Sequence, residues 1–94
     1  MRVRYTPRAA ANLSEIYHYL EDRSPKSARQ VEQLIRRLID GLADFPEAGR
    51  TTDLTGVRSL LAGRFPYLIL YRVRRNEIHI LHIRHTSREH WRGD

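Results

Sequence analysis

The chain has 94 residues, contains no cysteine and carries a formal net charge of +6. This length is enough for one domain and not for two, so we expect a single domain over residues 1–94. The lack of cysteine excludes a disulfide scaffold, a thiolate nucleophile and a cysteine-based zinc site. No apolar run approaches the roughly 20 residues that span a bilayer, and the N-terminus has no signal-peptide core. We therefore expect a cytoplasmic protein that does not bind a membrane.

Basic residues are unevenly distributed along the chain. Residues 1–47 contain eight Lys/Arg and seven Asp/Glu, whereas residues 48–94 contain nine and four, so the second half carries +5 of the total charge. Such a field attracts an acidic partner, either a nucleic acid or a protein, although charge can also serve solubility alone. Sixteen of the seventeen basic residues are arginine, which pairs with carboxylates or phosphates through two parallel hydrogen bonds.

Two helices are predicted in the first half of the chain. Thr6-Pro7 and Ser24-Pro25 each place a capping hydroxyl before a proline, which is typical of a helix start. Apolar residues follow each start at helical spacing; they are Ala9, Leu13, Ile16, Tyr17 and Leu20, and then Ala28, Val31, Leu34, Ile35, Leu38 and Leu42. The polar run 21–23 ends the first helix, and Phe45-Pro46 with Gly49 stops the second. The two helices should form an antiparallel hairpin.

Strands are predicted at the N-terminus and in the second half, over residues 2–5, 57–61, 67–74 and 77–84, with residues 44–56 as a loop. Arg75-Asn76 is predicted as a tight turn, because asparagine tolerates left-handed backbone geometry. In the last strand, simple alternation puts Ile78 and Ile80 on one face and Leu81 and Ile83 on the other, which predicts a central strand covered at least partly on both faces.

The order of these elements is β-α-α-β-β-β. Helices followed by a run of strands indicate an α+β fold with a small, mostly antiparallel sheet. The helical hairpin must then cover one face of the sheet, and the other face stays partly open.

Five segments resemble the RelE/ParE toxin superfamily, and together they cover nearly the whole chain. They are the helical pattern Ala9, Leu13, Ile16 and Tyr19; the loop 45–50 (FPEAGR); Val57-Arg58-Ser59-Leu60; the strand 66–73 (PYLILYRV); and the ending 80–85 (ILHIRH) followed by Arg88. Each segment alone is weak, but five in register at the family's spacing are specific. The resemblance implies a RelE-like fold and the toxin half of a type II toxin–antitoxin pair.

The resemblance also implies a partner. A cognate ParD-like antitoxin would lay an acidic, amphipathic C-terminal segment over the toxin and form a hetero-oligomer with it. A two-helix layer on an incompletely covered sheet leaves a groove for such a segment, and the positive second half of the chain would attract it.

The superfamily has two main activities. RelE-like members cut mRNA on the ribosome, and ParE-like members poison DNA gyrase without an established catalytic site. RelE-like enzymes place an arginine after the tyrosine of the long strand, where this chain has Leu68 after Tyr67, and a basic pair in the preceding strand, where residues 58–62 contain no lysine. These departures favour gyrase over mRNA, ribosome or other RNA as the target. A degenerate member that only binds an antitoxin or nucleic acid is a third alternative.

The candidate functional residues are mostly cationic. In the gyrase interpretation, these residues bind the target or the antitoxin, or serve the structure; they are Arg58, Arg64, Arg72, Arg84, His85, Arg88 and Trp91. The gyrase-binding surface is placed, as a hypothesis, at the open side of the sheet and the basic C-terminal end. In the RNase interpretation, His85 is the acid or base, assisted by Arg84 or Arg88, and Arg58 adds positive charge. A structural hydrogen bond is an equally good interpretation of His85.

The histidines at positions 79, 82 and 85 are spaced by three, which suggests a metal site if they were helical. On a strand, alternation points His82 away from the other two, and His79 and His85 lie roughly 20 Å apart. We therefore expect no metal site and no cofactor.

Overall fold

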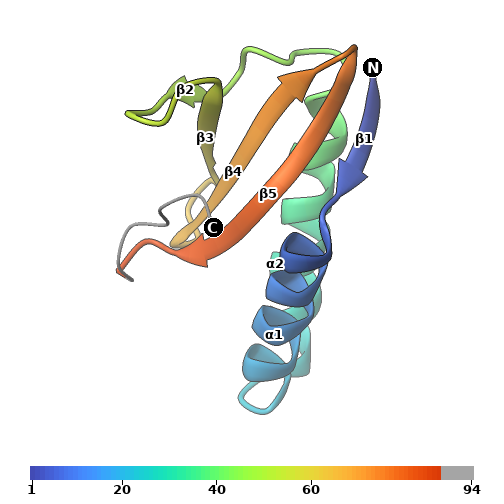
Figure 1. The fold of residues 1–94 in the computed structure, drawn as a ribbon. Helices are drawn as coiled ribbons and strands as arrows, with labels where there is room; N and C mark the ends of the chain where they lie inside the picture. Colours follow the sequence, from blue (N-terminus) through green and yellow to red (C-terminus); the bar gives the residue numbers. More distant parts are fainter. Residues whose placement is uncertain (88–94) are drawn as a thin grey trace.

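The computed structural model describes residues 1–87, in which two helices pack on one face of a five-stranded sheet (Figure 1). The elements in chain order are β1 (Arg2–Tyr5), α1 (Pro7–Glu21), α2 (Pro25–Gly41), β2 (Arg50–Thr51), β3 (Val57–Leu61), β4 (Tyr67–Arg74) and β5 (Glu77–His85). The strand order across the sheet is β1-β5-β4-β3-β2. β1 runs parallel to β5, and the other neighbouring pairs are antiparallel. The predicted α+β, RelE-like fold is confirmed.

The element bounds differ from the prediction in two places. The short strand β2 pairs with β3 inside the segment predicted as a loop, and β5 includes His85, which was assigned to the tail. Neither α1 nor α2 has the length and apolar composition that a membrane crossing requires.

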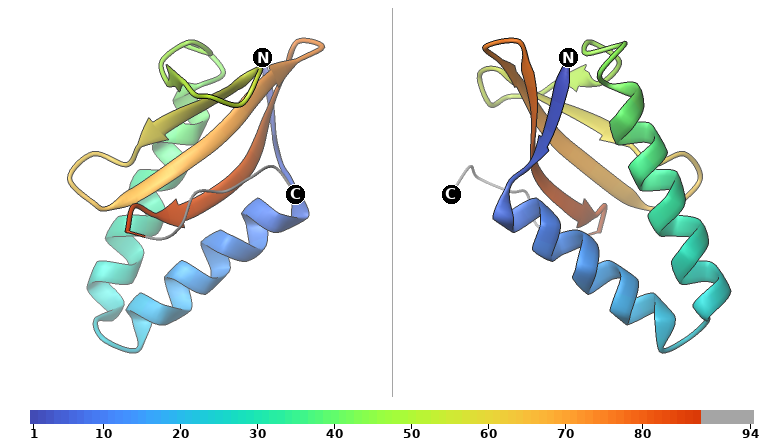
Figure 2. Two further views of the ribbon diagram at one scale, coloured as in Figure 1. Left: turned by 60° about the vertical axis from the view of Figure 1, so that its left-hand side comes forward. Right: turned by 90° about the vertical axis from the view of Figure 1, so that its right-hand side faces the viewer.

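Both helices begin at their predicted caps. Thr6 Oγ1 accepts a hydrogen bond from the amide of Ala9 at 3.1 Å, and Ser24 Oγ accepts one from Ser27 at 3.2 Å. Each cap satisfies a backbone donor that the first helical turn leaves without a partner. From their connecting loop the two helices diverge like the arms of a V (Figure 2).

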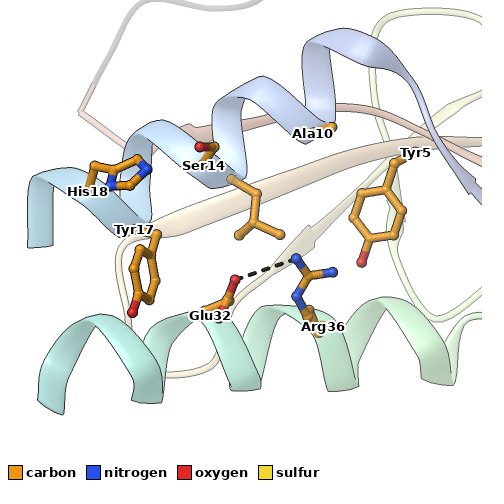
Figure 3. Close-up of a pocket in the computed structure, with 8 residues that line it drawn as sticks. Tyr5, Ala10, Ser14, Tyr17, His18, Glu32 and Arg36 are labelled. Carbon is orange, nitrogen blue, oxygen red and sulfur yellow. Dashed lines mark hydrogen bonds and ion pairs between the residues drawn. The ribbon is translucent and has the colours of Figure 1, made fainter. Parts of the chain in front are cut away.

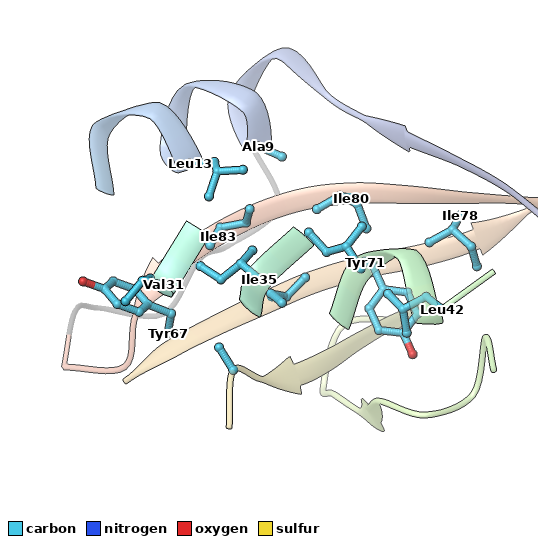
Figure 4. Packing of buried hydrophobic residues seen from close by; sticks show 13 residues of the cluster. Ala9, Leu13, Val31, Ile35, Leu42, Tyr67, Tyr71, Ile78, Ile80 and Ile83 are labelled. Carbon is cyan, nitrogen blue, oxygen red and sulfur yellow. The ribbon is translucent and has the colours of Figure 1, made fainter. Parts of the chain in front are cut away.

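The core lies between the helical layer and the sheet (Figure 4). It is built from the apolar stripes of both helices and from alternate positions of the inner strands; its larger members are Leu13, Val31, Ile35, Ile39, Leu42, Tyr67, Ile69, Tyr71, Ile78, Ile80 and Ile83. Ile35 and Ile39 of α2 are fully buried, as are Ile78 and Ile80 of β5. Burying this apolar surface supplies the main driving force for packing the hairpin on the sheet.

β5 departs from simple alternation at Leu81. Tyr71 pairs with Ile80 but Leu70 pairs with His82, so Leu81 is an extra residue that forms a β-bulge. The bulge shifts the alternation by one position and brings Ile83 into the core with Ile80. The prediction that Ile83 faces away from Ile78 and Ile80 was therefore wrong, and so was the argument for two covered faces that depended on it.

The same bulge changes the orientation of the histidines. His79 pairs with Arg72 and His82 with Leu70, two positions that share one face of β4, whereas His85 pairs with Tyr67 on the other face. The prediction that His82 points away from both other histidines was wrong, because it assumed unbroken alternation along the strand.

The edge of β5 beyond the end of β1 is completed by α1. Thr6 Oγ1 donates a hydrogen bond to the carbonyl oxygen of Leu81 at 3.2 Å, and Asn12 Oδ1 accepts one from the amide of Ile83 at 3.1 Å. These side chains satisfy backbone groups that a longer β1 would otherwise pair, and they tie the first helix to the bulge.

Candidate functional site

One face of the sheet is turned away from the helices, and we call it the open face. Figure 1 looks onto it, with α2 fainter behind the strands. Residues paired across neighbouring strands share a face, so the register assigns the positions of this face. Among the described residues they are Arg2 and Arg4 of β1, Glu77, His79, His82 and Arg84 of β5, Leu68, Leu70, Arg72 and Arg74 of β4, Val57, Ser59 and Leu61 of β3, and Arg50 of β2.

The described open face is strongly positive, and Glu77 is its single carboxylate. Glu77 Oε2 accepts a hydrogen bond from Arg4 Nε at 3.1 Å, and its Oε1 lies 3.0 Å from His79 Nε2. The hydrogen bond with His79, and then the one from Arg4, hold the pKa of Glu77 below its usual value. Glu77 is thus ionised at neutral pH and orders two neighbouring cationic or polar side chains.

The candidate residues proposed from the sequence do not form one cluster. Arg72 and Arg84 lie on the open face, whereas Arg58 and His85 pair with Tyr71 and Tyr67 on the face that carries the helices. Arg64 is exposed in the turn between β3 and β4, with its guanidinium carbon 5.1 Å from the centre of the Phe65 ring. Residues 88 and 91, where Arg88 and Trp91 stand, lie outside the described part of the chain.

Arg58 anchors the loop that follows α2. Its Nη1 donates a hydrogen bond to the carbonyl oxygen of Gly49 at 2.8 Å. The hydroxyl of the fully buried Tyr71 accepts a hydrogen bond from the Gly49 amide at 2.8 Å and donates one to the Pro46 carbonyl at 2.8 Å. Arg58 and Tyr71 together hold this loop against the helix side of the sheet, which is a structural role.

We expect Tyr71→Phe to lower the free energy of unfolding by about 2 kcal/mol, because removing the hydroxyl leaves two backbone groups without their buried partner. Urea denaturation of the purified protein measures this change. Tyr19→Phe is the matched control, since the Tyr19 side chain is largely exposed and should change stability by less than about 0.5 kcal/mol. Equal effects of the two substitutions would contradict the assigned role of the Tyr71 hydroxyl.

His85 is held by its neighbours. Its ring meets the Tyr67 ring edge to face at 5.5 Å between centroids, and its Nδ1 accepts a hydrogen bond from the Ser87 amide at 3.1 Å. Arg84 Nη1 donates to the carbonyl oxygen of His85 at 3.1 Å and so contacts its backbone rather than its ring. In this arrangement the imidazole is oriented by packing and by a local turn.

Sequence reasoning missed Arg2, Arg4, Arg74 and His79 as members of one surface. It assigned the positive field to the second half of the chain, but the parallel pairing of β1 with β5 brings two N-terminal arginines beside it. The alternation Arg2-Val3-Arg4-Tyr5 was a usable signal, because it puts both arginines on one face of a strand. The neighbour of that strand could not be deduced from it.

A second feature is a hollow of about 380 Å³ between the helices, on the opposite side of the molecule from the open face (Figure 3). Its lining combines aromatic, small and charged side chains: Tyr5, Ala10, Leu13, Ser14, Tyr17, His18, Glu32 and Arg36. Arg36 Nη2 lies 3.4 Å from Glu32 Oε2, and its guanidinium carbon lies 5.9 Å from the Tyr5 ring centre. Burial raises the pKa of the Tyr5 phenol, so its hydroxyl is protonated at neutral pH and can donate a hydrogen bond. Residues 1–87 contain no cluster of three or more metal-binding side chains.

Comparison with known proteins identifies the family. The family model described as the ParE toxin of the type II toxin–antitoxin system, parDE, matches residues 3–90. The chain belongs to the ParE toxin family. It is therefore a type II toxin, and the fold and the superfamily predicted from the sequence are confirmed.

Individual relatives agree with this assignment. This ParE-family toxin is 35% identical to putative toxin Y4kP of Sinorhizobium fredii (94% of this chain, 91% of the relative) and 37% identical to toxin RelE2 of Caulobacter vibrioides (93% and 97%). A solved structure of a chromosomal ParDE TA system from P. aeruginosa aligns with a TM-score of 0.80 at 34% identity, covering 93% of this chain and 97% of the other. The isolated E. coli RelE toxin aligns at 0.64 with 14% identity (94% and 86%), which shows a shared fold.

Proposed function

We propose that this ParE-family toxin acts by binding DNA gyrase rather than by cutting RNA. The observation that carries the proposal is the dispersal of the residues that an RNase would use. Arg58 is tied to the Gly49 carbonyl, and Arg84 and His85 occupy opposite faces of β5. RNA cleavage needs a base, an acid and cations around a single phosphate.

Distances along the sheet support the same conclusion. Arg58 and His85 share the helix side, but their β4 partners, Tyr71 and Tyr67, are four residues apart. At about 3.3 Å per residue this separation is roughly 13 Å, too long for both side chains to act on one phosphate without a large rearrangement. Leu68 stands beside Arg84 on the open face, so a leucine occupies the position where the RelE-like pattern has an arginine.

A ParD-like antitoxin is the proposed partner, and the hollow between α1 and α2 is its proposed docking groove. An amphipathic segment could place an apolar side chain against Leu13 and Tyr17 and an acidic one near Arg36. The similar solved structure from P. aeruginosa is described as a ParDE TA system, which supports a partner of this kind.

RNA cleavage is the second candidate function, because a relative that is 37% identical over most of both chains is named toxin RelE2. Two assays separate the candidates: supercoiling by gyrase in vitro with the purified toxin, and integrity of mRNA in cells that express the toxin without an antitoxin. Blocked supercoiling with intact transcripts is the expected result. Rapid transcript cleavage would establish the RNase instead, and harmless expression of folded protein would identify a member without toxicity.

We propose that gyrase contacts the open face, and a substitution of Leu61 tests this proposal. The Leu61 side chain is 54% exposed on that face, and Phe45 is 71% exposed in the loop after α2. We expect Leu61→Asp to weaken inhibition of supercoiling by about tenfold, as for loss of an apolar interface residue. Phe45→Asp is the matched control, because it adds the same charge at an exposed apolar position elsewhere. Equal losses from the two substitutions would contradict a gyrase site on the open face.

A further inference from the structure

Cations gather at the end of the open face where β4 turns into β5, and we call this group the hairpin-end patch. Two paired rows cross three strands there: Arg2, Glu77 and Arg74 form one, and Arg4, His79 and Arg72 form the other. Arg75 lies in the turn itself. Figure 1 shows the N-terminus beside this turn. With five arginines and one carboxylate, the patch holds most of the net charge of the chain.

The arginines of the patch are accessible. Arg2, Arg4, Arg74 and Arg75 are exposed, and Arg72 is half-buried. Neighbouring strands lie about 4.8 Å apart and alternate residues of one strand about 6.7 Å apart, so the backbone positions of the two rows cover an area of roughly 10 by 7 Å. A DNA duplex presents one phosphate for about every 3.4 Å of axis on each strand. Long arginine side chains can therefore reach several successive phosphates from this area.

The backbone conformation of Arg75 is a second indication that the positive charge of the patch has a role. Arg75 and Asn76 both have positive φ, 52° and 62°, as in the two-residue turns that suit the twist of a hairpin. Glycine or asparagine adopts this geometry with least strain, and a longer side chain adopts it at a conformational cost. The chain therefore carries a cation at the tip of the patch where an uncharged turn residue would be easier to accommodate.

The surroundings of the patch favour a nucleic acid backbone over other acidic partners. No phenylalanine, tyrosine or tryptophan lies on the described open face, whereas proteins that bind single strands usually stack bases on such large aromatic rings. An acidic protein segment would need an apolar anchor beside the cations. Val57, the apolar residue paired with Arg72, is only 3% exposed, and the exposed Leu61 lies at the other end of β3. A duplex, whose bases are already stacked, needs only the phosphate contacts that arginine supplies.

We propose that the hairpin-end patch binds the phosphate backbone of duplex DNA without reading its sequence. The choice of DNA over duplex RNA rests on the proposed gyrase target. Bound in this way, the toxin would hold the DNA segment on which gyrase acts while the rest of the open face contacts the enzyme.

The test is fluorescence anisotropy of a labelled, mixed-sequence DNA duplex with purified toxin freed of antitoxin, over a range of salt concentrations. The variant R72A/R74A should bind roughly tenfold or more weakly at low salt, and the slope of log K against log salt should fall by about 2. R29A/R37A is the matched control, since both arginines are exposed on α2 and the net charge changes equally. Its slope should stay unchanged. An equal effect of both double variants would overturn the proposal, because net charge alone would then explain binding.

A substitution of Glu77 should change the affinity for DNA in the opposite direction. E77Q removes the carboxylate of the patch and should strengthen DNA binding by up to about fivefold, the range of one surface charge pair. E15Q, at an exposed position of α1, should leave binding unchanged. Weaker binding by E77Q would contradict the assigned site, and thermal denaturation of each variant verifies that it is folded.

Competition experiments distinguish the alternative ligands. Polyglutamate that displaces DNA at equal charge concentration would identify an acidic-protein site, and duplex RNA that binds as tightly as DNA would overturn the choice of DNA. These measurements contain no gyrase. A toxin that binds DNA through the patch but leaves supercoiling intact would contradict the proposed function alone, and one that blocks supercoiling without binding DNA would contradict this inference alone.

Discussion

Replacing Gly49 with alanine is expected to lower the free energy of unfolding by about 3 kcal/mol, at the upper end of what an overpacked core position produces. A Cβ at this position would lie 2.7 Å from the Ser59 carbonyl oxygen and 2.7 Å from Cε1 of Tyr71. The first neighbour belongs to a strand backbone and the second to a fully buried ring, so neither can move away easily. Urea denaturation of the purified toxin measures the loss.

Gly41→Ala is the matched control for this prediction. Gly41 is the last residue of α2, and a Cβ there would meet no atom within 4 Å. Alanine is a better helix former than glycine, so this substitution should raise stability by up to about 1 kcal/mol. If Gly49→Ala were as well tolerated as Gly41→Ala, the close approach of the loop after α2 to Tyr71 would be refuted.

Ile83→Ala is expected to destabilise the protein by about 3 kcal/mol, because truncating a buried isoleucine removes apolar contacts and leaves a cavity. Ile83 is 2% exposed and packs in the core on the helix side of β5. Thermal or urea denaturation of the variant reports the change.

Leu81→Ala is the comparison that tests the bulge. Leu81 is only half-buried, so its truncation should destabilise by about 1 kcal/mol, in proportion to the smaller apolar area removed from water. Unbroken alternation would put residues 81 and 83 on one face and predict similar losses. Equal destabilisation by the two substitutions would therefore argue against the register found here, and with it against the membership of the open face.

The loop anchor and the bulge both bear on function. Gly49, Tyr71 and Arg58 hold the loop after α2 on the helix side, which commits Arg58 to a structural contact. The bulge at Leu81 turns His82 and Arg84 toward the open face and His85 toward the helix side. These two features separate the side chains that a sequence-based RNase hypothesis would combine. The charged residues that remain on the open face are mostly arginines.

Most of the element bounds were predictable from local signals. A hydroxyl followed by a proline begins each helix, and a left-handed turn at Arg75-Asn76 separates the last two strands. Caps and turns act over three or four residues, so the neighbouring sequence contains the information that places them. The two-residue strand β2 had no such signal, because it exists only through its pairing with β3.

The membership of the candidate site was only partly predictable. Arg72, Arg84, Arg58 and His85 were proposed together as binding residues, but the first two lie on the open face and the last two on the other face. These residues were selected by their charge and their place in the second half of the chain, which does not show which of them are close in space. Alternation within a strand states which residues share a face of that strand, but not which strand lies next to it.

The sequence by itself determined the two capped helices, the four longer strands, the excess of arginine and the resemblance to the ParE toxin family, because these depend on local order and composition. Only the tertiary structure decided which arginines share a surface. Arg4 meets Glu77 across 73 positions of the chain, through the parallel pairing of the first strand with the last. The bulge at Leu81 likewise depends on α1, since Thr6 and Asn12 complete its backbone hydrogen bonds. The local sequence of each of these segments does not identify the segment that it contacts. The positive face of this toxin therefore forms only when the sheet is assembled.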